Sequence, residues 1–587
     1  MLSKSLTDKS FIWLLAAPVI LNLLLPGEVH VWTKWIVPAA ALAVAGAAIG
    51  QWLLREDGLL AHTGAPPVAF LVLLALGAVS TLFNRVNYSR SRDMLIMLAA
   101  YFVLYAVFRT GPAARALRPV LWMVWGASVF IAVYAVYQYF FLWDGMGSAA
   151  RSMAGMSAAQ ASALRHRLAG MRVFSVFALP TTLSDFLALT FPLNVALVLT
   201  SIRRPVRMLV TAIPLLVNLW ALFLTQSFTG FLSLAFCVGI FYLSGERIVA
   251  TVRRQWKLTV VLALFFVAAF AFLLYVRKMI LVETVAENPL ALRMVNWRIG
   301  LSAVKDYPMV GVGLDNYQTV YTQYMKSGEH QARHAHSAPI EMMAETGILG
   351  GVAFLLLIAR WLRRAWHHLR RPQESGPERI GLALAFFAIS FQNLLDIGIY
   401  FPSQGFLTFM LAGLMDGPAG AGKIPSGIPA HWRKGLAVMA ILAGLGAALL
   451  CRRLMLAEIA YGEAAELYAA GDTPAAETRV RESIAIDPKP YEPFEMLGSH
   501  QLRVGTAAAP AYDSYSQAIL RSPLTASLHR GLSLAAAQMG EPLRAYMEAR
   551  RAAELFPASA VYAADRDRFY DALAGSFPDS PNQGRDR

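Results

Sequence analysis

The stretch RHAHSAPIEMMAETGILGG, residues 333 to 351, places two histidines and two glutamates around the start of an apolar run. Proline is tolerated only in the first turn of a helix, so Pro339 predicts a helix that begins at about Ser337 or Ala338, with Ser337 as its N-cap. The apolar residues that follow are typical of a membrane helix. The stretch therefore predicts ionisable groups at the mouth of a membrane helix, where such groups are candidates for function.

The composition also indicates a membrane protein. Of 587 residues, 57% are hydrophobic and 15% are charged, whereas a soluble domain carries about 25% charged residues. Apolar stretches of spanning length, roughly 17 to 25 residues each, recur along the chain. They lie near residues 11–26, 35–54, 67–83, 94–109, 119–142, 183–201, 207–225, 228–244, 257–276, 346–362, 379–399, 403–416 and 435–451. We expect an all-α fold, with a polytopic bundle of about 12–13 membrane helices over residues 1–454.

Basic residues in the short loops predict the orientation of the bundle. Lys and Arg gather at residues 109–118, 202–207, 245–257, 360–371 and 431–434. Because short loops rich in Lys and Arg stay on the cytoplasmic side, these loops are expected to face inward. The loops at 143–182 and 277–345, and the C-terminal tail, then face outward. The net charge of +15 fits inward loops that contact anionic lipid.

Small residues and prolines repeat along the tail at intervals of 34 and 35 residues. The repeated positions are Gly471, Gly505 and Gly540, and Pro488, Pro523 and Pro557. This period is typical of tetratricopeptide repeats, which stack helix pairs into a curved module. We expect soluble tetratricopeptide-like repeats over residues 455–570 that bind a peptide or protein partner, with an unspecific bundle of helical hairpins as the alternative. Residues 571–587 are expected to be disordered.

The sequence offers little for a metal ion or cofactor. The only cysteines, Cys237 and Cys451, fall in different predicted spans, so neither a disulfide framework nor a Cys-based metal site is expected. His334 and His336 have no third His or Cys close by in the sequence, whereas a catalytic zinc site normally has three protein ligands. The GVGLDN run follows no strand and is interpreted as a tight turn rather than a phosphate loop. We therefore expect no metal and no cofactor.

Four ordered motifs resemble those of the O-antigen ligase and polymerase superfamily. The most specific is P-x-x-G-V-G-x-x-N-Y followed by H-A-H-S-x-x-I-E-x-x-x-E-T-G-I-L-G. The others are RVFSVFALPTTLSDFLAL (172–189), the R-x-x-x-W segment in ALRMVNWRIG, and NLLDIGIYFP (393–402). The resemblance covers about residues 60–420, with 277–345 as the large periplasmic loop. Phe228 stands where members often have an arginine, Ser337 and Thr181 where Asn is usual, and the residue that replaces the missing arginine is left open.

This resemblance implies a metal-independent glycosyltransferase of the bacterial inner membrane. Such proteins take a glycan from undecaprenyl diphosphate and transfer it, on the periplasmic side, to a glycan, lipid or protein acceptor. The active loop and the tail would both lie on the periplasmic side, and tetratricopeptide tails are common in such proteins. Membrane lipids and a protein bound to the tail would be further partners, and nucleic acid would not be one.

Under this interpretation, His336 is the candidate base that deprotonates the acceptor hydroxyl, because histidine has a reference pKa of about 6.5. Either Glu341 or Asp396 could orient its ring, and we take Glu341 as part of the catalytic group. A histidine that only hydrogen-bonds the diphosphate is the alternative. His334 is expected to have a supporting or structural role near the substrate.

A diphosphate leaving group requires fixed positive charge, and the planar fork of arginine suits phosphate oxygens. The candidates are Arg172, Arg293, Arg298 and Arg333, all predicted to lie outside. The alternative for each of them is an arginine that reaches toward the lipid headgroups.

Three other functions compete with this interpretation. A solute or glycan transporter usually shows internal repeats and charges near the middle of the membrane, and neither is evident in the sequence. A scaffold would use the tail alone and would not need His336. A protein O-oligosaccharyltransferase shares the same motifs, so ligase, polymerase and protein transferase are not separated, although the tail favours polymerisation or a protein-guided acceptor.

Overall fold

The computed structural model describes residues 2–55, 67–83, 86–143, 172–244, 289–329, 331–417, 429–504 and 508–575. Within these ranges helices are joined by turns and short loops, and no strand is present. The all-α polytopic fold class predicted from the sequence is confirmed.

The membrane part is built from long apolar helices. In chain order they and the short helices between them are α1 (Leu2–Leu24), α2 (Val31–Arg55), α3 (Val68–Phe83), α4 (Tyr88–Phe108), α5 (Gly111–Arg115), α6 (Leu117–Tyr137), η2 (Gln138–Leu142), α9 (Pro180–Ser201), α10 (Pro205–Leu224), α11 (Phe228–Leu243), α14 (Pro289–Asp306), α15 (Tyr317–Tyr321), η4 (Thr322–Tyr324), α16 (Ala338–Arg370), α17 (Pro372–Leu395), η5 (Gly398–Tyr400), α18 (Pro402–Asp416) and α19 (Ala430–Ala470). In the described ranges, 8 of them are long and apolar enough to cross a membrane. The predicted span at 257–276 lies outside the described residues, and each of the others overlaps a helix.

Helix α18 is buried along nearly its whole length, mainly against α4 and α1. The rings of Tyr101 and Phe409 stack with centroids 4.7 Å apart. A side chain at Gly413 would come within 2.5 Å of the Tyr105 carbonyl oxygen, so only glycine permits this close approach of the two helices. The segment that joins α17 to α18 is therefore anchored at the core of the bundle.

Helix α16 is interrupted at Gly347, whose φ of +78° and ψ of 174° only glycine adopts readily. The interruption frees backbone groups on either side of it. The Ala344 and Glu345 carbonyl oxygens accept from Val312 and Gly313 at 2.8 and 3.0 Å, and the Ile348 amide donates to the Pro308 carbonyl oxygen at 2.9 Å. The tight turn predicted at GVGLDN thus donates hydrogen bonds to carbonyl oxygens that the interruption of α16 leaves free. These bonds hold the first two turns of α16 in place.

The last membrane helix continues into the tail without a break. The predicted boundary between residues 454 and 455 lies inside α19, which extends to Gly471 and ends there in a left-handed cap with a φ of +86°. Six further helices follow, in order α20 (Thr473–Ile486), α21 (Glu492–Val504), α22 (Ala508–Ile519), α23 (Ala526–Gln538), α24 (Pro542–Leu555) and α25 (Ala560–Gly575). Each packs mainly on its neighbours in the chain, so the tail is a row of helical hairpins. Its assignment to the tetratricopeptide class stays a prediction.

Part of the predicted disordered segment is ordered. Residues 571–575 complete α25, because Phe569 in its middle is buried against the preceding helices and holds the helix to them. Residues 576–587 lie outside the described residues.

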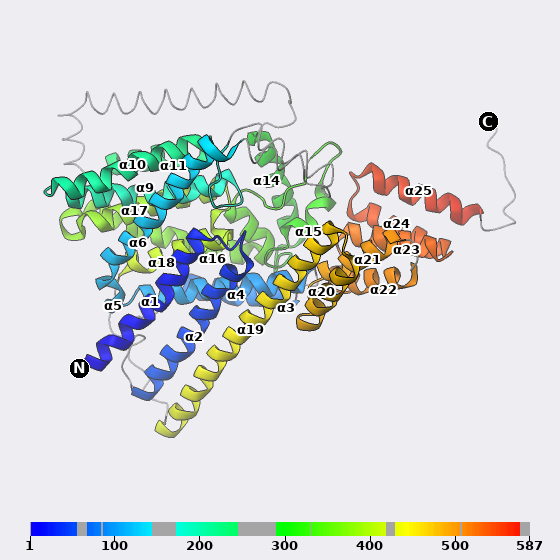
Figure 1. Ribbon diagram of the computed structural model, residues 1–587, viewed down its shortest axis with the longest axis horizontal. Coiled ribbons are helices and arrows are strands. Elements are labelled where there is room, and N and C mark those ends of the chain that lie inside the picture. The colour runs from blue at the N-terminus through cyan, green and yellow to red at the C-terminus, as the bar shows by residue number, and fades with distance from the viewer. Residues whose placement is uncertain are drawn as a thin grey trace.

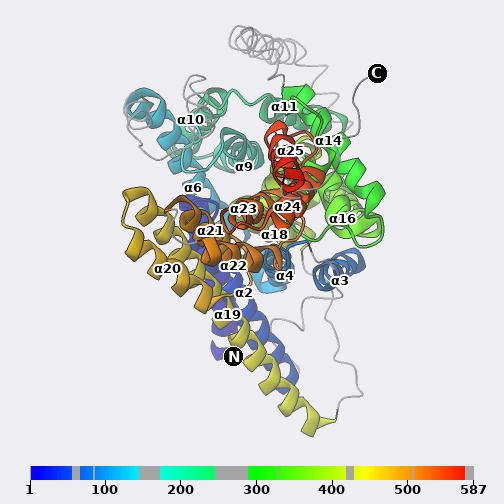
Figure 2. The ribbon, with the colours of Figure 1, turned by 90° about the vertical axis from the view of Figure 1, so that its right-hand side faces the viewer.

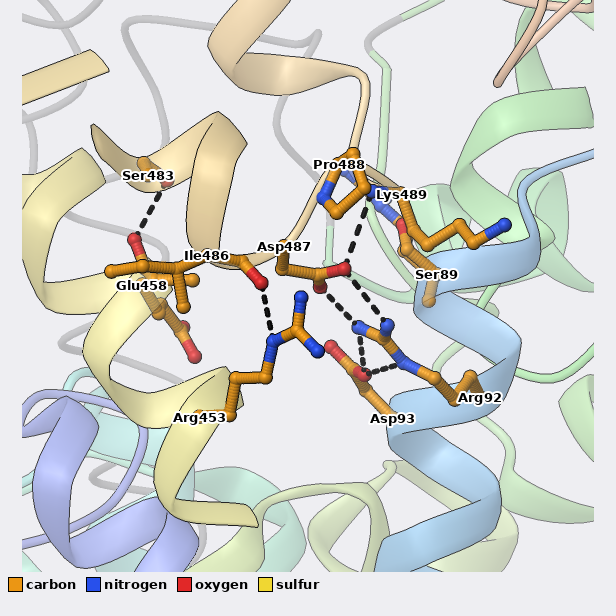
Figure 3. A network of polar contacts seen from close by, with 12 residues as sticks. Ser89, Arg92, Asp93, Arg453, Glu458, Ser483, Ile486, Asp487, Pro488 and Lys489 are labelled. Atoms are coloured by element: carbon orange, nitrogen blue, oxygen red, sulfur yellow. Dashed lines mark hydrogen bonds and ion pairs between the residues drawn. The ribbon is translucent and has the colours of Figure 1, made fainter. Parts of the chain in front are cut away.

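The tail lies against one end of the membrane bundle, close to α4 and α15 (Figures 1 and 2). The Thr322 hydroxyl of η4 donates to the Leu555 carbonyl oxygen at 3.0 Å. Arg92 of α4 lies 2.8 Å from carboxylates on both sides, Asp93 of its own helix and Asp487 of the tail. Figure 3 shows Arg92 between these two side chains. The tail is therefore joined to the membrane part by side chains as well as by the continuous helix.

Candidate functional site

The loop that leads into α16 holds His336 in a strained conformation. Its φ is +51°, a value that residues other than glycine seldom adopt. The indole N–H of Trp297 donates to the His336 carbonyl oxygen at 3.1 Å. Ser337 is the N-cap residue, as predicted, although its side chain makes no capping hydrogen bond. Strained residues of this kind gather at functional sites.

The His336 ring is oriented by Asp396 at the end of α17. Its Nδ1 lies 3.1 Å from Oδ1 of Asp396, and the histidine side chain is 34% exposed whereas the aspartate is 3% exposed. The backbone supports the pair, because the Ala338 amide donates to the Asp396 carbonyl oxygen at 3.2 Å. The start of α16 and the start of the α17–α18 connection are thus held together. Because Nδ1 faces Asp396, Nε2 is the nitrogen of the His336 ring that remains for a substrate in the described structure.

Arg293 supplies positive charge beside this pair. Its Nη2 lies 3.5 Å from Oδ2 of Asp396, and its Nε donates to the Leu395 carbonyl oxygen at 2.8 Å. Burial by itself would raise the pKa of Asp396. The hydrogen bond and charge of His336, together with the charge of Arg293, outweigh burial and hold that pKa below the ordinary value of 3.8. Asp396 is therefore a carboxylate under physiological conditions.

This depressed pKa predicts how stability depends on pH. Ionised Asp396 stabilises the folded protein above its unfolded-state pKa, and this contribution falls as pH drops through the lower folded-state pKa. We expect the Asp396→Asn variant to have a lower Tm than the wild type by a constant amount above about pH 5, and the difference to shrink below that. Thermal unfolding in detergent across pH 3 to 8 measures this. A difference that stays constant down to about pH 3 would contradict it.

His334 belongs to a separate pair. Its Nδ1 lies 2.6 Å from Oε1 of Glu341, and the Ala335 amide donates to Oε2 at 2.8 Å. Glu341 is fully buried. Of the two carboxylates considered for His336, Asp396 makes the contact and Glu341 orients its neighbour instead.

A third carboxylate, that of Glu345, helps to hold the first turns of α16 in place. Glu345 is fully buried, and the Tyr400 hydroxyl donates to its Oε2 at 3.1 Å. The Ser80 hydroxyl donates to its carbonyl oxygen at 2.7 Å. Glu345 therefore ties the first turns of α16 to α3 and η5.

The four arginine candidates lie in different surroundings. Arg293 adjoins the histidine pair, whereas Arg172 donates from Nε to the Thr225 carbonyl oxygen at 3.0 Å and so contacts the end of α10. Arg298 donates two hydrogen bonds to the carboxylate of Glu329, at 2.9 and 2.8 Å. Arg333 is exposed and lines a cavity together with His334. Of the four, Arg293 is the one for which a contact with Asp396 is described.

Sequence reasoning did not single out Asp185 of α9. It is 1% exposed, and the Gln392 side-chain amide donates to it. A side chain at Gly398 would come within 2.6 Å of its Oδ2, so Asp185 packs against the connection just after Asp396. The sequence nevertheless contained a signal for Asp185, because an acidic residue in an apolar span is a candidate for function.

In the part of the chain that the structure describes, no group of three or more His, Cys, Asp or Glu side chains is arranged to hold a metal ion.

Comparison with known families addresses the central segment. Residues 213–355 match a family model described as O-antigen ligase. The matched segment includes His334, His336 and Glu341, and it ends before Asp396 and the tail. No curated protein matches the chain. Residues 213–355 of this polytopic membrane protein are therefore similar to the O-antigen ligase family, and this similarity suggests a reaction of the glycosyltransferase type.

Proposed function

We propose that this protein transfers a glycan from undecaprenyl diphosphate to a hydroxyl group of an acceptor, at the periplasmic face of a bacterial inner membrane. The observation that carries the proposal is the pair formed by His336 and Asp396, with Arg293 beside it. A carboxylate on one ring nitrogen fixes the tautomer and leaves the other nitrogen as a proton acceptor. The outward face is inferred from the basic loops on the opposite side.

In the proposed reaction, the acceptor oxygen attacks the anomeric carbon of the donor glycan. Nε2 of His336 takes the hydroxyl proton, and Asp396 stabilises the imidazolium that forms. The bond between the anomeric carbon and the diphosphate oxygen breaks, and undecaprenyl diphosphate leaves with the electron pair. Arg293 supplies fixed positive charge where negative charge develops. No step in this scheme requires a metal ion.

The other arginine candidates fit this scheme less directly. The charge of Arg298 is already compensated by the bidentate contact with Glu329. Arg172 contacts the Thr225 carbonyl oxygen, and Arg333 lines the cavity beside His334. Arg293 is therefore the arginine that the proposal relies on, because its contact with Asp396 is described. The residue that takes the place of the arginine missing at Phe228 stays open.

The test is transfer by the purified protein from an undecaprenyl-diphosphate glycan, with products sized by gel and mass spectrometry. Arg293→Ala should lower transfer by at least about tenfold, because removing a single group that stabilises developing charge commonly costs 10²–10³-fold. Lys305→Ala is the matched control, since Lys305 is an exposed cation on the same helix, and it should leave transfer unchanged.

The size of the products separates the members of the family. A ladder of products would identify a polymerase, and one discrete addition to lipid or protein would identify a ligase or a protein oligosaccharyltransferase. Well-folded wild-type protein that consumes no donor with any of these acceptors would overturn the proposal.

A further inference from the structure

A cavity of about 370 Å³ lies between the membrane part and the tail. Its described walls come from α2, α4, the connection before α18, α19 and α21, and His334 lines it beside Tyr400 and Phe401. This volume falls within the range of about 300–1,000 Å³ found for sites of small ligands. Since His334 is two residues before His336, the cavity reaches the segment that carries the proposed base.

Of the four Lys and Arg side chains of the membrane part that line this cavity, three are paired with carboxylates of the tail, and the fourth is the exposed Arg333. The pairs are Lys34 with Glu458 at 2.9 Å, Arg90 with Glu492 at 3.1 Å and Arg92 with Asp487 at 2.8 Å. Glu28, Asp93 and Asp315 add further acidic groups to the wall. Because three of these four cations are compensated and the wall carries further carboxylates, the cavity suits a diphosphate poorly, since a diphosphate requires uncompensated positive charge.

A second cavity of about 480 Å³ lies among the helices of the tail. It is lined by aromatic and polar side chains, among them Tyr468, Tyr515 and Tyr562. Tyr461 of α19 and Glu492 of α21 line both cavities. The two cavities therefore adjoin at these residues, and we call the pair, which extends from the tail to His334, the tail track.

Buried polar atoms along the tail track have no protein partner in the described structure. They are Oε2 of Glu28 in the first cavity, and the hydroxyl oxygen of Tyr468 and Nδ1 of His500 in the second. Burial of a polar group without a hydrogen-bond partner costs folding free energy, so each such group calls for an explanation. Burial also raises the pKa of Glu28 to about 7, so near neutral pH its carboxyl group can donate as well as accept a hydrogen bond.

We infer that the tail track binds the acceptor as an extended saccharide chain, whose end reaches His334 and whose following sugars lie along α19 and α21. Sugar hydroxyls both donate and accept, and so satisfy carboxyl, phenol and imidazole groups alike. Aromatic rings offer large rigid contact area at small entropic cost. The inference rests on the proposed function, and it makes the tail part of the acceptor site rather than only a docking module for other proteins.

The first test uses acceptor kinetics with Tyr461→Ala, which alters the junction of the two cavities. We expect KM for a multi-unit acceptor to rise at least about tenfold, the change that corresponds to 1.4 kcal/mol, while kcat and KM for the donor stay unchanged. Tyr570→Ala is the matched control, because Tyr570 lies on the tail but is 55% exposed and lines neither cavity. An unchanged acceptor KM in Tyr461→Ala, or an equal change in donor KM, would overturn the inference.

The second test does not depend on turnover and so separates this inference from the proposed function. The probe is the multi-unit saccharide acceptor of the first test, free of lipid and diphosphate, titrated calorimetrically into the full-length protein. Binding should be weaker in Tyr461→Ala and Glu28→Gln, and inorganic diphosphate should not compete. If the saccharide did not bind to the wild-type protein, a peptide would be the better candidate ligand of the tail track, and the inference would be overturned. Displacement of the bound saccharide by inorganic diphosphate would also overturn it.

Discussion

Replacement of His336 by alanine should reduce glycan transfer by about 10²–10⁴-fold, the usual contribution of a general base. Donor binding should persist, because Arg293 keeps its contact with the Leu395 carbonyl oxygen. Asp396→Asn should lower kcat in the same direction, since an amide no longer fixes the ring tautomer or stabilises the imidazolium. Single-turnover transfer from a radiolabelled donor measures both variants, with donor binding determined separately.

His367→Ala is the control for this experiment. His367 lies on the same helix, α16, but near its far end and exposed, so its removal should leave transfer unchanged. Transfer at the wild-type rate by a folded His336→Ala variant would refute the role of base. A loss of donor binding equal to the loss of rate would favour the alternative, in which His336 only hydrogen-bonds the diphosphate.

Replacement of Gly347 by alanine should destabilise the protein strongly. The backbone there has a φ of +78° and a ψ of 174°, a conformation that costs other residues about 1–3 kcal/mol. A Cβ atom would also lie 2.3 Å from the Met309 carbonyl oxygen, and such overpacking costs about 1–3 kcal/mol more. We expect a loss of roughly 2–6 kcal/mol in the free energy of unfolding, visible as a lower Tm in detergent.

Gly446→Ala provides the contrast. Gly446 lies within α19 with no atom near the position of an added Cβ, and alanine favours a helix by about 1 kcal/mol over glycine. Its Tm should be equal or higher. If Gly347→Ala were as stable as the wild type, the interruption of α16 would not be required by the fold.

Local patterns in the sequence determined the helices and the candidate base. The apolar stretches predicted each span in the described ranges, because burial in lipid requires about 20 consecutive apolar residues whatever the packing around them. Pro339 alone set the start of α16, since proline restricts both its own φ and its hydrogen bonding. Two of the repeated glycines, Gly471 and Gly540, have positive φ angles close to the ends of α19 and α23.

Only the tertiary structure decided which groups meet. Glu341 is close to both histidines in sequence, yet it contacts His334, while His336 contacts Asp396, which is sixty residues further along the chain. The reason is that the left-handed turn at His336 and the anchoring of the α17–α18 connection by α18 direct the two rings to different partners. The contact of Asp487 with Arg92 likewise depends on how α19 leaves the bundle, and no local pattern encodes it.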